Sequence, residues 1–288
     1  MSDKIDAELN LKKFNMAIVG DDKVCVFIGK RKTGKSVGVK DLLYHNRHIP
    51  SGVVISGTEN ANKFYGRIIP EQYIHDAFDE DLTDNIILRQ VHNIDMLREQ
   101  YPDLDDDEFD KIKKDANIGC FIVLDDLMFD QKWVRNKTVA QLFMNGRHYK
   151  ILFIVTMQYP LGILPGLRTN VDYVFIFREN NISNRRKIYE HYAGIFPTFD
   201  MFCQVMDACT NDYGCLVIDN NAKGTKVEDV VYWYRASEHK DFPIGSSEFR
   251  NYGKTHHNTY KDDEYYHKKQ KKLHKKQCNL KVQKDSHS

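Results

Sequence analysis

The sequence predicts an α/β fold, a three-layer sandwich with a mainly parallel central sheet. Short apolar runs rich in β-branched residues alternate with helix-compatible segments through most of the chain. The apolar runs are continuous, which is typical of strands buried on both faces of a parallel sheet. One of these runs leads directly into a glycine-rich loop that opens a helix. These three observations favour a strand–loop–helix architecture around one sheet.

The expected elements follow from the same patterns. Buried strands are predicted at 24–28, 52–56, 120–124, 151–155 and 171–177, with a short strand at 86–88. Helices are predicted at 37–44, 92–114 with an interruption near Tyr101-Pro102, 131–145, 184–193 and 199–209. Two late strands, 214–219 and 230–234, flank a turn-rich segment and predict an antiparallel terminal hairpin.

The chain is expected to divide into three parts. Residues 1–22 form an N-terminal lead-in, residues 23–244 form one α/β domain, and residues 245–288 form a basic tail. From Lys254 onward the chain carries ten lysines against four acidic residues and almost no aliphatic residues, which predicts disorder. The folded part is therefore mildly acidic, although the formal net charge of the whole chain is +1.

Composition excludes several classes of protein. No segment approaches the run of about 20 apolar residues that a membrane-spanning helix needs. The charged N-terminus has no apolar stretch of the secretory type. Six cysteines are scattered without a C-x-x-C pair, which indicates a reducing compartment and no structural zinc.

The glycine-rich loop GKRKTGKS, residues 29–36, fits G-x-x-x-x-G-K-[ST] at every fixed position. Glycines let the loop turn tightly, and its N–H groups with the following helix N-terminus form a concave anion site. The loop therefore predicts binding of ATP phosphates, with Lys35 reaching the β- and γ-phosphates and Ser36 placing its hydroxyl on Mg²⁺. The predicted nucleotide-binding residues are Gly29, Lys30, Arg31, Lys32, Thr33, Gly34, Lys35 and Ser36.

Two other predicted strands end in polar residues that suit the same chemistry. The run 120–124 is followed by Asp125 and Asp126. Asp125 suits the Mg²⁺ shell, and Asp126 can orient or deprotonate the attacking water. Gln158 follows the strand at 151–155 and is the predicted γ-phosphate sensor, because carboxyl ends of parallel strands meet at one edge of the sheet.

Several segments together carry a family resemblance. They are GKRKTGKS, FIVLDD, FMNGRHYKILFIVTMQYPLGILPGLRTNVDYVFIFREN, RRKIYEHYAGIFPTFDMFCQVMD and CLVIDN, within about residues 20–236. In these segments the chain resembles the poxvirus-type genome-packaging ATPases of large double-stranded DNA viruses, members of the FtsK–HerA superfamily of P-loop ATPases. The resemblance implies Mg²⁺-dependent ATP hydrolysis that drives double-stranded viral DNA into a preformed capsid.

The resemblance also assigns residues and partners. Lys35, Ser36, Asp125 and Gln158 match the family's phosphate, magnesium and sensor positions, whereas Asp126 stands where the superfamily more often carries Glu. Arg147 matches an arginine finger that acts on a neighbour's γ-phosphate, with Arg168 as the competing candidate. The implied partners are double-stranded DNA, viral capsid or membrane-associated capsid proteins, and identical subunits in a pentameric or hexameric ring. The implied location is the viral factory in the host cytoplasm, and the virion.

Other functions are compatible with the P-loop alone. A DNA helicase would share the motor core, and a nucleotide kinase would need an arginine-rich lid, of which the sequence shows no compact cluster. A GTPase is disfavoured because no Asn-Lys-x-Asp signature occurs. A nucleotide-binding scaffold subunit without turnover stays open because of the Asp126 departure.

Overall fold

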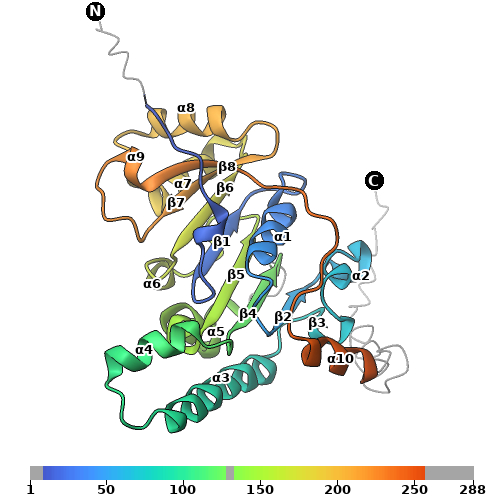
Figure 1. Cartoon of the computed structure of the whole chain (residues 1–288). Helices are drawn as coiled ribbons and strands as arrows, with labels where there is room; N and C mark the ends of the chain where they lie inside the picture. The colour runs from blue at the N-terminus through green and yellow to red at the C-terminus, as the bar shows by residue number, and fades with distance from the viewer. Residues whose placement is uncertain (1–8, 128–132, 257–288) are drawn as a thin grey trace, which may run out of the picture.

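The central feature of the computed structural model, which describes residues 9–127 and 133–256, is one mixed sheet (Figure 1). Its eight strands in the described residues run in the order β3-β2-β4-β5-β1-β6-β7-β8. Neighbours from β3 to β6 pair in parallel, whereas β7 is antiparallel to both β6 and β8. The strands are β1 (Val24–Ile28), β2 (Ser51–Ser56), β3 (Ile74–His75), β4 (Cys120–Asp125), β5 (Ile151–Met157), β6 (Tyr173–Phe177), β7 (Gly214–Asp219) and β8 (Val231–Arg235).

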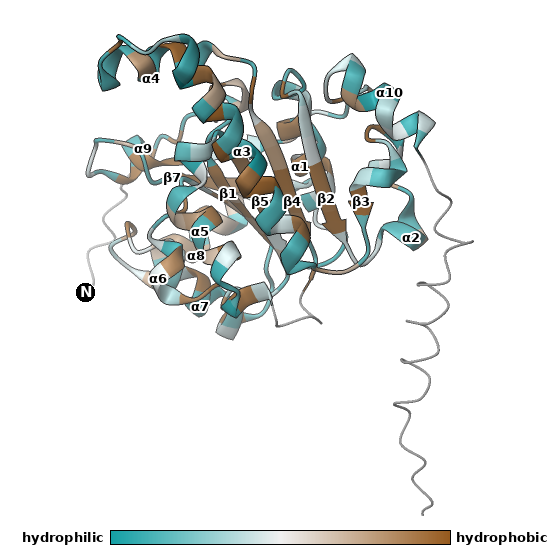
Figure 2. Cartoon of the chain, turned by 90° about the horizontal axis from the view of Figure 1, so that it is seen from below, coloured by the Kyte–Doolittle hydropathy of each residue, from teal (hydrophilic) through white to brown (hydrophobic). Residues whose placement is uncertain are grey.

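Helices cover both faces of this sheet. Helix α1 (Lys35–His45) packs on one face together with the N-terminal segment. The opposite face is covered by α3 (Glu80–Gln100), α5 (Lys137–Asn145), α7 (Ile182–Tyr192) and α8 (Phe199–Cys209). Alternate residues of β1 enter the two cores, Val26 on one side and Phe27 on the other. Figure 2 shows the central strands as largely hydrophobic ribbons among helices that carry hydrophilic stretches. The predicted three-layer α/β sandwich is confirmed.

The N-terminal lead-in is tied to the far edge of the sheet. The Phe14 amide donates to the Trp233 carbonyl of β8 at 2.9 Å, and Trp233 N–H donates to the Lys12 carbonyl at 3.1 Å. The Phe14 ring is buried and makes edge-on contacts with Tyr173 and Phe175. Residues 12–14 therefore pair with β8 at the edge of the sheet, and the short 3₁₀ helix Met16–Ile18 follows them.

Two of the predicted elements are placed differently. The short strand expected at 86–88 is wrong, because these residues lie inside α3, whose N-cap Asp79 accepts from Leu82 N–H. Ile86 and Ile87 pack on the core while Leu88 is exposed, a helical rather than a strand pattern. Helix α5 begins after its N-cap Asn136, later than the predicted start at 131, and residues 128–132 lie outside the described part.

A further helix lies beyond residue 244, where the predicted domain ends. Helix α10 (Ser247–Thr255) occupies part of the segment in which no regular structure was expected. Phe249 of α10 stacks on Tyr73 with ring centroids 3.9 Å apart, and the Tyr73 hydroxyl donates to the Phe249 carbonyl. Residues 257–288 of the predicted tail lie outside the described residues.

Shorter helices complete the described chain: α2 (Glu59–Asn62), α4 (Asp106–Asp115), α6 (Pro165–Arg168) and α9 (Val227–Val230). The 3₁₀ turns are Tyr65–Arg67, Glu71–Tyr73, Trp133–Arg135 and Gly146–Tyr149. Asp106, Asp107 and Glu108 form the exposed first turn of α4. Among the described residues, no helix has the length and apolarity needed to cross a membrane.

Candidate active site

The predicted phosphate loop connects β1 to α1 at the carboxyl edge of the sheet. The Gly29 N–H donates to the Met157 carbonyl at 3.0 Å, which holds the start of the loop beside the end of β5. The Thr33 hydroxyl donates to the Lys30 carbonyl at 2.8 Å and closes the loop on itself. The N-cap of α1 is Gly34, so the amino end of this helix points into the loop.

The two glycines of the motif have different structural reasons. Gly34 adopts φ +104°, a left-handed conformation that L side chains rarely take. At Gly29, a Cβ atom would lie 2.6 Å from Cβ of Phe177 and 2.8 Å from the Thr33 hydroxyl. Gly29 is therefore required by its close approach to β6, and Gly34 by backbone conformation.

Lys35 is folded back over its own loop. Its ammonium donates to the Gly29 carbonyl at 2.5 Å and to the Lys30 carbonyl at 2.8 Å. Burial lowers the pKa of Lys35, and the nearby carboxylates of Asp126 and Asp125 oppose that change. A buried cation beside two acids is placed to meet a phosphate chain.

Asp125 is held by hydroxyls from the two neighbouring strands. The sheet register aligns Ser56 of β2, Asp125 of β4 and Thr156 of β5 across three adjacent strands. The Thr156 hydroxyl donates to Oδ1 of Asp125 at 2.6 Å, and the Ser56 hydroxyl donates to Oδ2 at 3.2 Å. Burial raises the pKa of Asp125 even though these hydrogen bonds favour its ionised form. The carboxylate is thus fixed in orientation in an environment that favours a compensating cation.

Asp126 and Gln158 form a second polar pair at the same edge. Asp126 adopts φ +53°, and its N–H donates to the Thr156 hydroxyl at 3.1 Å. The Gln158 amide donates from Nε2 to Oδ2 of Asp126 at 2.5 Å. Thr156 therefore links Asp125 and Asp126, and Gln158 holds the second carboxylate.

These groups line one cavity of about 1030 Å³. Lys35, Ser36, Asp125, Asp126 and Gln158 all contribute to its wall. The wall also includes Tyr213, Arg235 and Glu238. The cavity therefore brings together the predicted phosphate, metal and sensor residues, although they are far apart in the sequence.

A buried acid at the end of β6 anchors the loop from the other side. Glu179 accepts an ion pair from Lys30 at 2.7 Å, and its side chain is 2% exposed. Burial acts to raise the pKa of Glu179, but hydrogen bonds from Lys30, Asn181 and Asn184 outweigh it and leave the pKa below its ordinary value. Sequence reasoning missed Glu179, although it stands just after a buried strand as Asp125 does.

Other residues of the site also escaped the sequence analysis. Ser56 and Thr156 each stand at the end of an apolar run, and this position is the sequence feature that could have indicated their place in the site. Tyr65 is buried near Asp125 and Glu59. Burial is the main cause of its raised pKa, and the negative charges of the two carboxylates raise it further. Its hydroxyl lacks a hydrogen-bond partner within the described residues. Tyr213, with φ +63° and 66% exposure, had no signal in the sequence.

The two candidate finger arginines lie in different settings. Arg147 is exposed in the 3₁₀ turn before β5, whereas Gln158 follows the other end of that strand. The length of β5 separates them by roughly 20 Å. Arg168 donates from Nε to the Ile163 carbonyl at 2.9 Å and lies over the Tyr192 ring. Arg147 is therefore remote from the cavity of its own chain, and Arg168 is engaged in its own loop.

Solved structures share this fold. The genome packaging NTPase B204 of Sulfolobus turreted icosahedral virus 2, solved with sulfate, matches with a TM-score of 0.52 and 14% identity, covering 77% of this chain and all of that one. The same protein with AMP matches with a TM-score of 0.50 and 15% identity, over 76% of this chain and all of that one. EssC from Geobacillus thermodenitrificans matches with a TM-score of 0.52 and 13% identity, over 76% of this chain and 41% of that one. The fold is that of P-loop ATPases.

Proteins of several viruses are similar to this chain in sequence. The uncharacterized protein L437 of Acanthamoeba polyphaga mimivirus is 36% identical over 259 residues, which cover 90% of this chain and 88% of the relative. The uncharacterized protein 075L of Invertebrate iridescent virus 6 is 39% identical over 258 residues, which cover 88% and 93%. No protein-family model matches the chain. The chain belongs to the family of viral proteins that contains L437 and 075L.

Proposed function

We propose that this protein hydrolyses ATP with Mg²⁺ and uses the free energy to drive double-stranded viral DNA into a preformed capsid. The observation that carries the proposal is the convergence of Lys35, Asp125, Asp126 and Gln158 on one cavity beside the phosphate loop. A loop of this motif, an acid at the end of a neighbouring strand and a polar sensor are the parts that phosphoryl transfer to water requires.

The nucleotide binds through the loop. Its N–H groups and the amino end of α1 supply partial positive charge to the phosphates. Lys35 exchanges its contacts with the Gly29 and Lys30 carbonyls for the β- and γ-phosphates. Tyr213 lies on the cavity wall and offers an exposed ring on which a base can stack.

The site has the donors that Mg²⁺ needs. Hydroxyl and carboxylate oxygens are the ligands this ion prefers, and Ser36 and Asp125 supply one of each on the cavity wall. Ser56 and Thr156 orient the Asp125 carboxylate from behind. When bound with ATP, Mg²⁺ neutralises charge on the β- and γ-phosphates.

Asp126 and Gln158 position the attacking water. An amide that donates to a carboxylate keeps its carbonyl oxygen as an acceptor for a water proton. The Asp126 carboxylate accepts the other proton and increases the nucleophilicity of the water as it approaches the γ-phosphate. Gln158 holds the Asp126 carboxylate in place through its hydrogen bond at 2.5 Å.

The proposed packaging role is supported by the viral relatives, by the shared fold and by the segments that resemble genome-packaging ATPases. We propose that subunits form a pentameric or hexameric ring and contact capsid or membrane-associated capsid proteins in the viral factory. Arg147 is exposed and remote from the cavity of its own chain, so we propose that in such a ring it acts on the cavity of a neighbouring subunit. A motor that moves any sequence grips DNA phosphates rather than base edges.

The test is steady-state ATP hydrolysis by the full chain, with and without long double-stranded DNA. We expect turnover that needs Mg²⁺, rises with DNA, is abolished in Lys35→Ala and is greatly reduced in Asp126→Asn. Fluorescent-nucleotide titration separates the two variants, since Asp126→Asn keeps binding and Lys35→Ala loses it. Nucleotide binding without turnover would indicate a scaffold subunit, and phosphate transfer to a nucleotide acceptor would indicate a kinase. Strand separation on forked DNA would indicate a helicase.

A further inference from the structure

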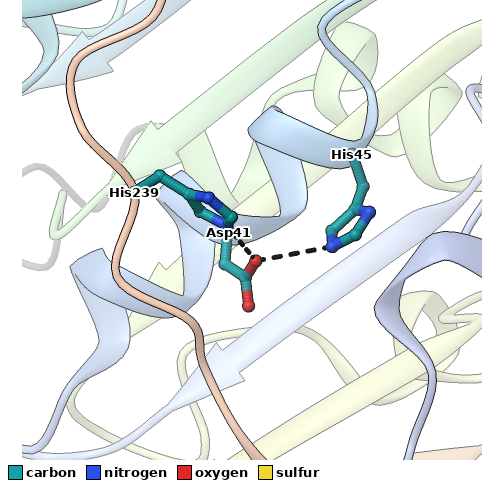
Figure 3. Close-up of side chains that lie close together, drawn as sticks. All are labelled: Asp41, His45 and His239. Carbon is teal, nitrogen blue, oxygen red and sulfur yellow. Dashed lines mark hydrogen bonds and ion pairs between the residues drawn. The ribbon is translucent and has the colours of Figure 1, made fainter.

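A second cluster of polar side chains lies on α1, on the segment that carries the phosphate loop. It consists of Asp41 and His45 of α1 and His239 of the segment after β8 (Figure 3). Asp41 and His45 are four residues apart and so share one face of the helix. One carboxylate oxygen and one nitrogen of each imidazole all lie within 4.8 Å of one another. None of these residues takes part in the site described above.

The Asp41 carboxylate is fully buried and held rigidly. Its Oδ2 accepts from the Tyr234 hydroxyl at 2.5 Å and from the Ser237 N–H at 2.9 Å. Burial and the hydrogen bond to Asp41 raise the pKa of Tyr234, so its hydroxyl stays protonated as a donor. Oδ1 is left to face the two histidines. A buried carboxylate so arranged needs positive charge beside Oδ1.

Both imidazoles turn the same nitrogen toward Oδ1. Nε2 of His239 lies 2.6 Å from Oδ1, and Nε2 of His45 lies 3.6 Å from it. The His239 ring stacks on Tyr44 with centroids 3.7 Å apart, which holds its plane. In a tetrahedral site with bonds of about 2.0–2.1 Å, ligand atoms lie roughly 3.4 Å apart. The His45 distance is already close to this, and the His239 ring needs to retreat by less than about 1 Å.

We propose that Asp41, His45 and His239 bind a divalent transition metal, with Zn²⁺ the ion that fits best. Two imidazoles and one carboxylate are a donor set typical of Zn²⁺, with water as the fourth ligand. Mg²⁺ does not suit this set, because it prefers oxygen ligands. The site is built without cysteines, which is why the cysteine pattern gave no sign of it.

The metal would join two elements that are distant in sequence. His239 follows Arg235, Ala236 and Glu238, which line the nucleotide cavity. Asp41 and His45 belong to the helix whose amino end forms the phosphate loop. A bound ion would therefore fix this wall of the cavity against α1, independently of the ion at Asp125.

The experiment is Co²⁺ and Zn²⁺ titration of the full chain after chelator treatment. Co²⁺ in a tetrahedral site gives intense visible absorption, and calorimetry with Zn²⁺ gives stoichiometry and affinity. His45→Ala and His239→Ala are expected to lose the tetrahedral Co²⁺ bands and one equivalent of bound Zn²⁺, with affinity at this site reduced roughly 100-fold or more. His48→Ala, an exposed histidine near the end of α1, is the matched control and should keep both. The residues after 256 contain further histidines and Cys278, which are also possible metal ligands. The proposal is therefore tested by the difference in metal uptake between variants, and not by the total uptake of the parent protein.

Folding is monitored by circular dichroism, and His239→Asn serves as a milder variant if His239→Ala unfolds. Zn²⁺ should raise the melting temperature of the parent and His48→Ala proteins but not of His239→Asn. Equal uptake and equal Co²⁺ spectra in all variants would overturn the proposal. A parent protein without tetrahedral Co²⁺ absorption would also overturn it. Neither result depends on ATP hydrolysis, so failure here is distinct from failure of the proposed function.

Discussion

Gln158 donates a hydrogen bond from Nε2 to Oδ2 of Asp126 at 2.5 Å, across the carboxyl ends of two adjacent strands. The pair joins the residue predicted as sensor to the residue predicted to activate water. Because each side chain restrains the other, we expect them to act as a unit in catalysis.

Gln158→Ala should therefore lower kcat by about 10²-fold while changing nucleotide affinity little, since one positioned donor is worth that much in other enzymes. Gln204→Ala, which removes an exposed glutamine bonded to Asp200 on α8, is the control. The double variant Gln158→Ala/Asp126→Asn should be no slower than the slower single variant. Independent, multiplying losses would show that the two residues act separately.

Asp125 gives a prediction on stability and pH. Its pKa is raised in the folded protein by burial, so folding favours its protonated form. Ionisation of Asp125 therefore reduces the stability of the folded protein as the pH rises above about 3.9, which is the pKa of an Asp side chain in the unfolded chain. Without Mg²⁺ at pH 7, Asp125→Asn removes the buried charge and should raise Tm. The rise should be about 2–4 °C for each kcal/mol gained in the free energy of unfolding. The difference should disappear in acid, where both side chains are neutral.

Thermal melts from pH 3 upward, on the order of one pH unit apart, would check this. Asp110→Asn is the matched control, because Asp110 is exposed and a hydrogen bond from Lys113 lowers its pKa, so no gain is expected. Stabilisation by Mg²⁺ and ATP should be lost in Asp125→Asn. A lower Tm at pH 7 without the ion, or a difference that does not vary with pH, would contradict the assignment.

The ion pair between Lys30 and Glu179 predicts a defect in binding. Glu179→Gln removes the buried charge that holds the phosphate loop against β6, and we expect KM for ATP to rise several-fold with kcat less affected. Because hydrogen bonding holds the pKa of Glu179 below its ordinary value, its stabilisation is present above about pH 4.3 and is lost as pH falls through the lowered pKa.

A double-mutant cycle with Lys30→Met measures this coupling through KM and through stability near neutral pH. The double variant should resemble the more damaged single variant. Strictly additive changes would mean that the contact at 2.7 Å does not position the loop.

Arg147 leads to a test by subunit mixing. Arg147→Ala should reduce turnover of assembled rings by about 10³-fold, as expected for a finger supplied in trans. Lys35→Ala subunits are expected to be inactive but retain Arg147. Mixed rings of the two variants should therefore recover part of the DNA-stimulated activity, because some intact sites then face an intact arginine.

Arg168→Ala provides the comparison. Arg168 is bonded to the Ile163 carbonyl, so its loss should lower Tm and should not be rescued by mixing. Arg147→Ala rings with normal DNA-stimulated turnover would show that Arg147 is not the finger.

Much of this molecule could be predicted from the sequence because its signals are local. A five-residue apolar strand, the GKRKTGKS loop and a helix-compatible run are consecutive along the chain, and each conformation is favoured by neighbouring residues. The paired acids and Gln158 followed from the rule that parallel strands end at one edge. The error at 86–88 arose because three apolar residues read alike in a strand and in a buried helix.

Local sequence patterns were therefore enough to predict the strand–loop–helix unit, the α/β class and the candidate residues that line the cavity. Which polar side chains contact one another depends on how the strands and helices pack. Ser56, Asp125 and Thr156 touch because three strands align in one register, and register depends on packing against both cores. Glu179 reaches Lys30, and His239 reaches Asp41, across long stretches of chain for the same reason. These contacts depend on long-range packing, which no local pattern of residues encodes.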